Sequence, residues 1–408
     1  MDSLTQSRPQ TLIIGGGAAG FFTAIQRAHH FPEEEITILE RGKGVLEKVR
    51  ISGGGRCNVT HACWDPRELV KYYPRGGKEL LGPFNNFACG DTMGWFEDRG
   101  VPLKIEEDGR IFPTSDSSQS IIDCLWNTAK AKGIRVLTKT RLVDLSIPEE
   151  DGKWKVTSTA GEHVADRLVI TTGSNPAVWK ILKKIGHQLI DPVPSLFAFD
   201  TKDTRLRGLS GISLPWAQLH IEGEKLKADG PLLITHRGLS GPAVLRLSAW
   251  GARDLAPHKY NFKLVVNWLA MRPVDVEAAL KDIQQSEAKR QLGTRAQFDL
   301  PVRLWKSLVE AAGIPAEKKW AELSKQSRAA LVVQLTAAKF NITGKSTNKE
   351  EFTTAGGVDL KEIDFRSFRS KVHPTLFLAG EVLDIDAITG GFNFQAAWTG
   401  GYLIGRSK

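Results

Sequence analysis

The sequence predicts an α/β protein in which a parallel sheet is interrupted by a β-rich insertion and a helical insertion. Three observations support this prediction. First, the N-terminal residues have the pattern of a strand, a glycine-rich turn and a helix. Second, apolar strand patterns return at residues 134–172 and 375–379. Third, residues 195–340 have a different hydrophobic pattern. Strands that alternate with helices form parallel sheets, so the intervening segment is best explained as an insertion.

A glycine-rich turn joins the first predicted strand to the first predicted helix. The apolar run at residues 11–14 leads into Gly-Gly-Gly-Ala-Ala-Gly at residues 15–20, and the apolar run at residues 36–39 ends on Glu40. This is G-x-G-x-x-G followed about twenty residues later by an acid, which is typical of dinucleotide-binding folds. The sequence therefore predicts a dinucleotide site near its N-terminus.

Each part of this pattern has a physical role. Gly15 permits the tight turn, Gly17 lets backbone amides approach a pyrophosphate, and Gly20 lets the helix pack close to the strand. The helix N-terminus offers a partial positive charge to the phosphates, and Glu40 can accept hydrogen bonds from a ribose diol.

Length and composition are those of a globular protein with two or three domains. The 408 residues are 41% hydrophobic and 25% charged, and no apolar stretch is long enough to cross a bilayer. Residues 1–10 lack the layout of a signal peptide, and four cysteines without regular pairing fit the reducing cytoplasm. The net charge of +9 is mixed with acids, so we expect a small-molecule substrate and neither a nucleic acid nor a membrane as partner. The sequence does not indicate the oligomeric state.

A second glycine-rich segment follows at residues 51–60. Its three successive glycines, Gly53 to Gly55, leave a backbone that can lie flat against a ligand. Arg56 can pair with phosphate, and Asn58 can exchange hydrogen bonds with a planar heterocycle. A mobile surface loop is the alternative interpretation of this segment, and the two have equal weight.

Residues 121–173 continue the first domain. The patterns predict a helix, a parallel strand and a hairpin, in that order: residues 121–132, 134–137 and 142–159, with the hairpin turn at Asp151-Gly152. A buried strand at residues 168–172 then ends in Thr172-Gly173. This ending puts backbone amides at the carboxyl edge of the sheet, where doubly wound folds bind ligands.

The hydrophobic pattern of the sequence changes after residue 192. Residues 195–270 are short alternating runs broken by Gly and Pro, as in a barrel or sandwich, and residues 273–340 have helical periodicity. No second G-x-G-x-x-G occurs in either segment. We expect the two parts of a dinucleotide-binding domain to flank a β-rich and a helical domain, with these boundaries: 1–192, 193–272, 273–345 and 346–408.

The C-terminal segment returns to the first domain. An apolar strand at residues 375–379 is closed by Gly380-Glu381, and Gly390-Gly391-Phe392-Asn393 opens a helix. The carboxylate can hold a ribitol hydroxyl, and the helix N-terminus can face the pyrimidine side of an isoalloxazine, where reduction places negative charge. Both ends of the chain therefore indicate one FAD site.

Together these segments resemble a family of bacterial NAD(P)/FAD-dependent flavoproteins of the aminoacetone-oxidase-like or 3-dehydro-bile-acid Δ4,6-reductase-like type. The matching segments run along nearly the whole chain: residues 15–20, 51–60, 109–113, 235–242, 354–358 and 379–393. The resemblance implies a Rossmann-like FAD-binding domain with an inserted β-barrel and a small helical domain. It also implies that residues 53–58 pack against the flavin, with Gly380-Glu381 and residues 391–393 completing its pocket.

The chain departs from the family pattern at several positions. Thr171 replaces the usual alanine, and residues 172–176 replace a longer stretch rich in glycine and serine. His61 stands where a second asparagine is usual, and Ala387 stands where glycine is common. The resemblance therefore supports FAD binding and does not transfer any relative's substrate.

The predicted cofactor-binding residues lie in the glycine-rich turns, at strand ends, in the hairpin and at the start of the last helix. They are Gly15, Gly17, Ala18, Ala19, Gly20, Glu40, Arg41, Ser52, Gly53, Gly54, Gly55, Arg56, Cys57, Asn58, Val143, Thr172, Gly173, Gly380, Glu381, Asp384, Gly391, Phe392 and Asn393. FAD is expected to bind non-covalently, with NADH or NADPH as the candidate electron donor. The sequence identifies no catalytic residue and no metal ligand.

The expected activity is that of an FAD-dependent oxidoreductase that passes hydride from a reduced nicotinamide through flavin to a small organic acceptor, such as an activated alkene. Three alternatives stay open: an oxidase that uses oxygen, a dithiol oxidoreductase through Cys57 and Cys63, and a non-enzymatic module that binds flavin and RNA. The two cysteines are one residue further apart than in the C-x-x-x-x-C of disulfide reductases. Tryptophans that could stack on RNA bases are expected in the core instead: Trp216, Trp250, Trp268 and Trp305.

His236 follows the apolar strand at residues 232–234 and begins a turn. We expect a buried histidine that holds this turn together. A histidine that faces the substrate from the inserted barrel is the alternative.

Overall fold

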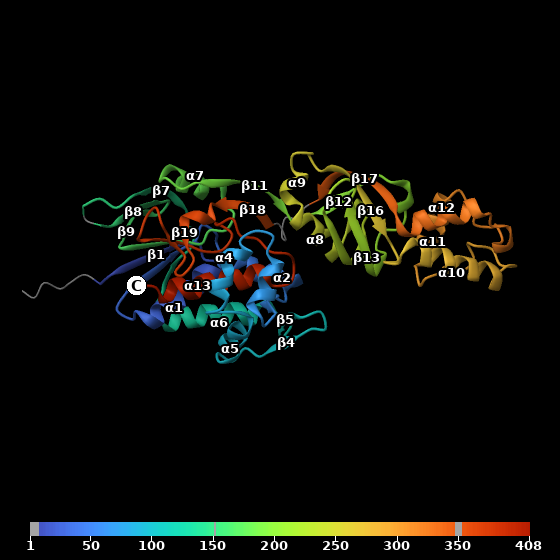
Figure 1. Cartoon of the computed structure of the whole chain (residues 1–408). Coiled ribbons are helices and arrows are strands. Elements are labelled where there is room, and N and C mark those ends of the chain that lie inside the picture. Colours follow the sequence, from blue (N-terminus) through green and yellow to red (C-terminus); the bar gives the residue numbers. More distant parts are fainter. Residues whose placement is uncertain (1–7, 151, 347–352) are drawn as a thin grey trace, which may run out of the picture. The chain divides into compact units, whose positions relative to one another are not determined.

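The computed structural model describes residues 8–150, 152–346 and 353–408 (Figure 1). The chain divides into two compact units: Met1–Val193 with Thr353–Lys408 form unit 1, and Pro194–Phe352 form unit 2. Unit 1 thus combines both ends of the chain, and unit 2 is one continuous insertion. The domain boundary expected at residues 272/273 falls inside unit 2.

Unit 1 is built on a seven-stranded sheet in the order β19-β20-β21-β10-β1-β2-β6. The five strands from β21 to β6 are parallel, and β19 and β20 are antiparallel at one edge. Their bounds are β1 Gln10–Ile14, β2 Glu35–Leu39, β6 Arg135–Leu137, β10 Arg167–Ile170, β19 Ile363–Asp364, β20 Arg369–Ser370 and β21 Leu376–Leu378. The chain passes from β1 to β2 on one side and returns to β10 on the other, so the carboxyl end of β1 lies at a topological switch point.

Two long helices from opposite ends of the chain pack against each other beside this sheet (Figure 1). They are α1, Ala18–His30, and α13, Phe392–Arg406. The helices approach closely because glycines line the contact: a Cβ on Gly401 would lie 3.0 Å from the backbone oxygen of Ala19. The C-terminal helix is therefore fixed beside the helix that follows the glycine-rich turn.

The remaining elements of unit 1 cover the sheet and its edges. They are α2 Glu47–Gly55, β3 Thr60–His61, α3 Pro66–Leu69, η1 Val70–Tyr72, α4 Gly77–Phe84, α5 Cys89–Glu97, β4 Leu103–Ile105, β5 Arg110–Pro113, α6 Ser118–Ala131, β7 Leu142–Ser146, β8 Trp154–Ser158, β9 Gly161–Ala165, α7 Pro176–Lys184, β11 Leu189–Ser195, β18 Thr353–Val358 and η4 Leu360–Glu362. The predicted hairpin at residues 142–159 is confirmed as the antiparallel pair β7-β8, and β9 extends it to a three-stranded meander. Asp151 of the predicted turn lies outside the described residues.

Unit 2 contains a closed barrel in the order β12-β15-β14-β13-β16-β17. Its strands are β12 Ala198–Asp200, β13 Ser213–Ile221, β14 Lys227–Ile234, β15 Gly238–Ser240, β16 Asn261–Asn267 and β17 Ala338–Ser346. The helical segment lies between β16 and β17 in the chain: α10 Pro273–Ser286, α11 Val302–Ala311, η3 Trp320–Glu322 and α12 Lys325–Thr336. Barrel and helices share one hydrophobic core, which includes Trp268, Trp305 and Phe340.

Short helices occur where the sequence predicted strands alone. After η2, Thr204–Leu206, the helices α8, Pro242–Trp250, and α9, Ala252–Leu255, follow the strand β15. Pro242 occupies the first position of α8, where the missing N–H of proline costs nothing because that group has no partner within the helix. Within the described residues, no helix is both long and apolar enough to span a membrane.

Candidate cofactor site

The turn between β1 and α1 has the geometry that a dinucleotide requires. The Gly15 amide donates to the Leu39 carbonyl at 2.8 Å, which ties the turn to the end of β2. A Cβ on Gly15 would lie 2.5 Å from the Thr171 carbonyl oxygen, and a Cβ on Gly20 would overlap the Gly15 carbonyl. At Gly17, apart from its own chain neighbours, no described atom lies within 4 Å of a Cβ position. Gly15 and Gly20 are therefore needed for packing, whereas Gly17 faces open space.

Glu40 lies at the carboxyl end of β2 and is held by two backbone amides. Its Oε2 accepts from the Gly16 N–H at 2.8 Å, and its Oε1 accepts from the Gly42 N–H at 2.6 Å. Arg41 beside it is exposed. Each carboxylate oxygen keeps acceptor capacity for a ribose hydroxyl, since an ionised carboxylate offers about four lone-pair sites.

The glycine-rich segment ends α2 and is largely open to solvent. Gly53, Gly54 and Gly55 have φ values of 58°, 68° and 86°, the left-handed region that glycine adopts without strain. A Cβ on Gly53 would lie 2.9 Å from the Phe112 ring, whereas Gly54 and Gly55 have no described atom within 4 Å of such a position. The Ser52 hydroxyl donates to the Val49 carbonyl at 3.0 Å. The exposed backbone of this turn is available to a ligand.

Arg56, predicted as a phosphate partner, is engaged by other groups. Its guanidinium pairs with Glu106 at 2.6 Å and with Asp116 at 3.4 Å, and it lies 3.9 Å over the Phe112 ring. The geometry therefore ties Arg56 to the β4–β5 hairpin.

Asn58 is buried and connects the glycine-rich segment to α13. In the orientation that satisfies both groups, its amide nitrogen donates to the Thr60 carbonyl at 2.9 Å and its oxygen accepts from the Gly391 N–H at 3.0 Å. The hydrogen-bonding groups that the sequence assigned to a heterocycle are thus used within the protein. Asn58 positions the N-terminus of α13.

The two cysteines of the dithiol alternative are held as thiols. Burial raises the pKa of Cys57 to about 12, and burial also raises the pKa of Cys63 to about 11. Both are free cysteines. A reactive dithiol needs a thiolate near neutral pH, so these environments weigh against that alternative.

The ends of β10 and β21 bring further predicted residues together. A Cβ on Gly173 would lie 3.5 Å from the Glu381 carboxylate and 3.8 Å from the Lys48 amine, and Lys48 forms an ion pair with Glu381. The hydroxyl of Thr172 is buried and has no hydrogen-bond partner among the described residues. A Cβ on Gly380 would lie 3.7 Å from the Cβ of Ala19, which with Ala18 forms the first turn of α1.

Lys48 was missed by the sequence analysis. It lies in the first turn of α2, ahead of the glycine-rich segment, where no sequence signal marks it.

Asn393, at the start of α13, is hydrogen-bonded to the backbone of the segment that precedes this helix. Its side-chain oxygen accepts from the Ala387 N–H at 2.9 Å, and its nitrogen donates to the Ala387 carbonyl at 3.2 Å. Asp384 is buried in the same segment, and Asp386 forms a buried ion pair with Arg75. Asn393 therefore holds the turn that opens α13.

Phe392, the first residue of α13, lies in an aromatic stack. Its ring is 4.3 Å from the Tyr72 ring at an interplanar angle of 10°, and 4.6 Å from the His61 ring at 20°. The Nδ1 atom of His61 is buried without a partner among the described residues, and burial lowers the pKa of His61. Tyr72 could not be predicted at this place, because the stack depends on long-range packing.

Thr171, one of the departures from the family pattern, has a structural role. Its hydroxyl donates to the carbonyls of Ile14 and Gly15, at 3.1 and 3.0 Å. These bonds fix the end of β10 to the end of β1. The predicted Val143, by contrast, lies on β7 and is 48% exposed.

In unit 2, two expectations about side-chain burial are wrong. His236 is exposed, and Thr235 holds the turn instead, because its hydroxyl accepts from the Arg237 and Gly238 amides. Trp216 and Trp250, expected in the core, are 51% and 42% exposed, whereas Trp268 and Trp305 are buried as expected. Trp216 lies within a register shift of β13, between Leu214 and Ala217, which turns it outward although its neighbours are apolar.

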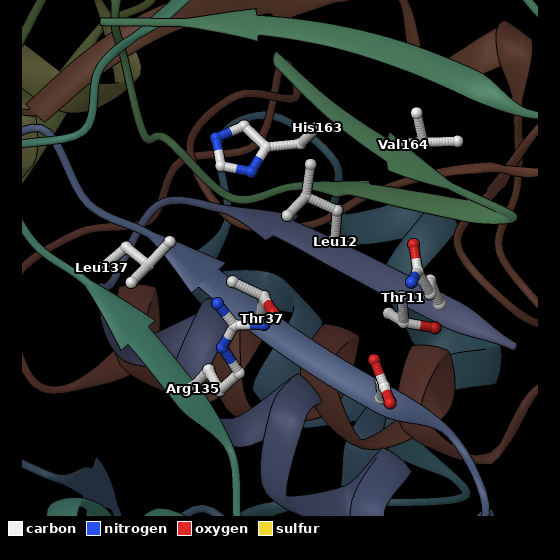
Figure 2. Close-up of a pocket in the computed structure, with 9 residues that line it drawn as sticks. Thr11, Leu12, Thr37, Arg135, Leu137, His163 and Val164 are labelled. Atoms are coloured by element: carbon white, nitrogen blue, oxygen red, sulfur yellow. The ribbon is translucent and has the colours of Figure 1, made fainter. Parts of the chain in front are cut away.

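A pocket of about 120 Å³ lies elsewhere, on the face of the sheet (Figure 2). Leu12 of β1, Thr37 of β2, Leu137 of β6 and His163 of β9 are among the residues that line it. It lies along the strands rather than at their carboxyl ends, and it is too small for a dinucleotide. We do not assign it to the cofactor.

The residues at the carboxyl edge fit FAD. Gly17, Gly54 and Gly55 face open space, and the Thr172 hydroxyl is an orphaned polar group of the kind that a ligand satisfies. The N-terminus of α13 supplies a partial positive charge at the opposite end of the site. The acid at the end of β2, the glycine-rich turn and the C-terminal helix define a Rossmann-like flavoprotein, in the class of FAD-dependent oxidoreductases.

The chain belongs to the HI0933-like family, because the family model described as HI0933-like protein Rossmann domain matches residues 9–407. The predicted family and the predicted fold class, a Rossmann-like domain with an inserted barrel, are confirmed.

Curated relatives cover nearly the whole chain. A Haemophilus influenzae protein named ribosomal RNA dihydrouridine synthase is 29% identical over 98% of both chains. A 3-dehydro-bile acid delta(4,6)-reductase from Clostridium scindens is 26% identical over 97% of this chain and 98% of its own. Among solved structures, a 3-ketosteroid-delta4-(5alpha)-dehydrogenase from Rhodococcus jostii RHA1 aligns over 99% of this chain and 98% of its own, with 15% identity and a TM-score of 0.51. That likeness shows the shared fold.

Proposed function

We propose that this protein uses FAD and a reduced nicotinamide to reduce a carbon–carbon double bond conjugated to a carbonyl in a small organic acceptor. The observation that carries the proposal is the two-ended site, in which Glu40 and the first turn of α1 lie at one end and the N-terminus of α13 lies at the other. When bound, FAD supplies a carrier that accepts hydride from the nicotinamide and delivers it to the acceptor. The names of the curated relatives support this acceptor class, since each denotes the reduction of such a double bond.

The residues of the chain have distinct roles in this proposal. Glu40 binds the adenosine ribose, and the amides that follow Gly15 bind the diphosphate. Glu381 accepts hydrogen bonds from the ribitol, and the open backbone of Gly54 and Gly55 lies against the ring system. The N-terminus of α13, held by Asn58 and Asn393, stabilises negative charge on the pyrimidine side when the ring is reduced.

The experiment follows each half of the reaction. The purified protein is loaded with FAD, and its flavin absorbance is followed anaerobically after the addition of NADH or NADPH. An α,β-unsaturated ketone or oxygen is then added to the reduced protein. Fast reoxidation by the enone with slow reoxidation by oxygen is expected. The opposite order would identify an oxidase, and a protein that stays colourless with FAD would contradict the proposal.

A uracil base within RNA is a second candidate acceptor, favoured by the charge of unit 2. Residues 194–352 contain 24 Lys and Arg but 16 Asp and Glu, so this unit carries nearly all of the net charge of +9. Trp216 and His220 are exposed on β13, where rings can stack on bases. Two relatives named ribosomal RNA dihydrouridine synthase match nearly the whole chain.

The two candidate acceptors are separated by one incubation. Reduced protein is mixed with ribosomal RNA at low and high salt, and nucleosides are analysed for dihydrouridine. Dihydrouridine formation that falls steeply with salt would support RNA as substrate, because phosphate contacts release counterions. Reduction of enones without any change in the RNA would support the small acceptor.

A further inference from the structure

Lys48 and Glu381 close the carboxyl edge of the sheet between the ends of β10 and β21. The Lys48 amine and the Glu381 carboxylate form an ion pair, and both lie within 4 Å of the Cβ position of Gly173. Gly380, next to Glu381, faces Ala19 in the first turn of α1. The ion pair therefore lies beside the N-terminus of the helix that is proposed to receive the diphosphate.

The partial positive charge of the helix N-terminus compensates only part of the charge of a bound diphosphate. The first turn of α1 is Ala18-Ala19-Gly20-Phe21, without a basic side chain. Arg56 is engaged with two carboxylates, Glu106 in the turn between β4 and β5 and Asp116 after β5. Lys48, in contrast, is 58% exposed on a flexible stem, and its carboxylate partner is 17% exposed. Its ammonium can therefore move toward a neighbouring anion without leaving water.

We propose that Lys48 exchanges partners when FAD binds: it pairs with Glu381 in the cofactor-free protein and with the FAD diphosphate in the loaded protein, which releases Glu381 to the ribitol hydroxyls. The proposal rests on FAD binding at this edge. Lys48 thus neutralises Glu381 when FAD is absent and the diphosphate when FAD is bound. In the loaded protein the ribitol hydroxyls are then the partners of Glu381. The exchange is favourable because an exposed Lys–Glu pair contributes little stability, whereas a charge-assisted bond to phosphate is strong.

The test uses ligands that contain different parts of FAD. Dissociation constants of the flavin-free protein are measured by calorimetry for FAD, for ADP, which keeps the diphosphate, and for riboflavin, which keeps the ribitol. For K48M, binding of both FAD and ADP should weaken by about tenfold, as expected for one lost charge-assisted contact, while riboflavin binds as tightly as before or more tightly, because Glu381 is released. For E381Q, FAD and riboflavin should bind more weakly while ADP binds as tightly as before or more tightly, because Lys48 is released.

The control is K155M, which removes another exposed lysine of unit 1 from an ion pair, here with Glu149 at 3.2 Å. It should bind all three ligands as the unaltered protein does. K48Q provides a second neutral variant, and thermal unfolding checks that each variant is folded.

Two results would overturn the exchange. Weaker FAD binding by K48M with unchanged ADP binding would mean that Lys48 acts only by orienting Glu381. Unchanged binding of every ligand by K48M and K48Q would mean that Lys48 stays on Glu381. If the unaltered protein binds neither FAD nor ADP, the proposed cofactor site fails, and with it the basis of the exchange.

Discussion

Thr60 and Gln395 are joined by a buried hydrogen bond of 2.6 Å although 335 positions separate them in the chain. The same Gln395 oxygen accepts from the Thr92 hydroxyl at 2.9 Å, and its nitrogen donates to the Thr399 hydroxyl at 3.1 Å. One glutamine on α13 thus connects the strand after the glycine-rich segment to α5. Because the N-terminus of α13 is proposed to face the flavin, this network fixes the geometry of the cofactor site.

Replacing Gln395 by leucine should destabilise unit 1 more than replacing Thr60 by valine. Gln395→Leu leaves the buried hydroxyls of Thr60 and Thr92 without their partner, and each unsatisfied group costs about 1–3 kcal/mol. Thr60→Val removes one donor while Thr92 still satisfies the Gln395 oxygen, so a loss of about 1 kcal/mol is expected. Urea unfolding of both variants measures the difference. Equal losses would show that the network does not act as a unit.

Alanine at Gly20 should lower stability, whereas alanine at Gly17 should weaken FAD binding. A Cβ on Gly20 would overlap the Gly15 carbonyl, so Gly20→Ala should lower stability by about 1–3 kcal/mol. Gly17 faces open space, so Gly17→Ala should fold normally and weaken FAD binding by about tenfold, or about 1.4 kcal/mol, by blocking the approach of the diphosphate. Thermal unfolding and flavin titration measure the two effects. FAD binding by Gly17→Ala as tight as that of the original protein would place the diphosphate elsewhere.

The five parallel strands of the sheet could be predicted, because local patterns determine them, whereas the short edge strands β19 and β20 were not predicted. The strand at residues 11–14, the glycine turn and the strand that ends on Glu40 correspond to β1, the start of α1 and β2. The partners of polar side chains could not be predicted. Arg56 has the chemistry to bind phosphate, but tertiary packing brings Glu106, between β4 and β5, and Asp116, after β5, to its guanidinium.

The same limit applies to Asn58, Asn393 and Lys48. The amides of Asn58 and Asn393 can bind a heterocycle or a backbone, and in the structure they bind the backbone around the start of α13. Lys48 pairs with Glu381 although 333 positions separate them in the sequence. Contacts of this separation depend on the assembled sheet, which no local pattern describes.

The cysteines should not take part in turnover. Burial raises the pKa of Cys63 from 9.0 to about 11, which lowers its thiolate fraction at neutral pH by about a hundredfold. Iodoacetamide should therefore modify the folded protein slowly, whereas the unfolded chain should react at all four cysteines. The thiol count should be the same before and after anaerobic reduction of the flavin. Two additional thiols after reduction would restore the dithiol alternative.

Unit 1 should lose stability as the pH falls below 7, in part through His61. In the folded protein, burial holds the pKa of His61 below its ordinary value of 6.5. At lower pH the unfolded chain therefore binds more protons than the folded chain. The contribution of His61 is therefore present above pH 6.5 and is lost as the pH falls toward the folded pKa, by about 1.4 kcal/mol for each unit of depression. His61→Asn should reduce the fall in the urea midpoint between pH 7.5 and 5.5. Because burial also lowers the pKa of His187, the variant should keep part of the dependence. An unchanged pH profile in His61→Asn would show that the folded protein accommodates a charged imidazole beside Phe392.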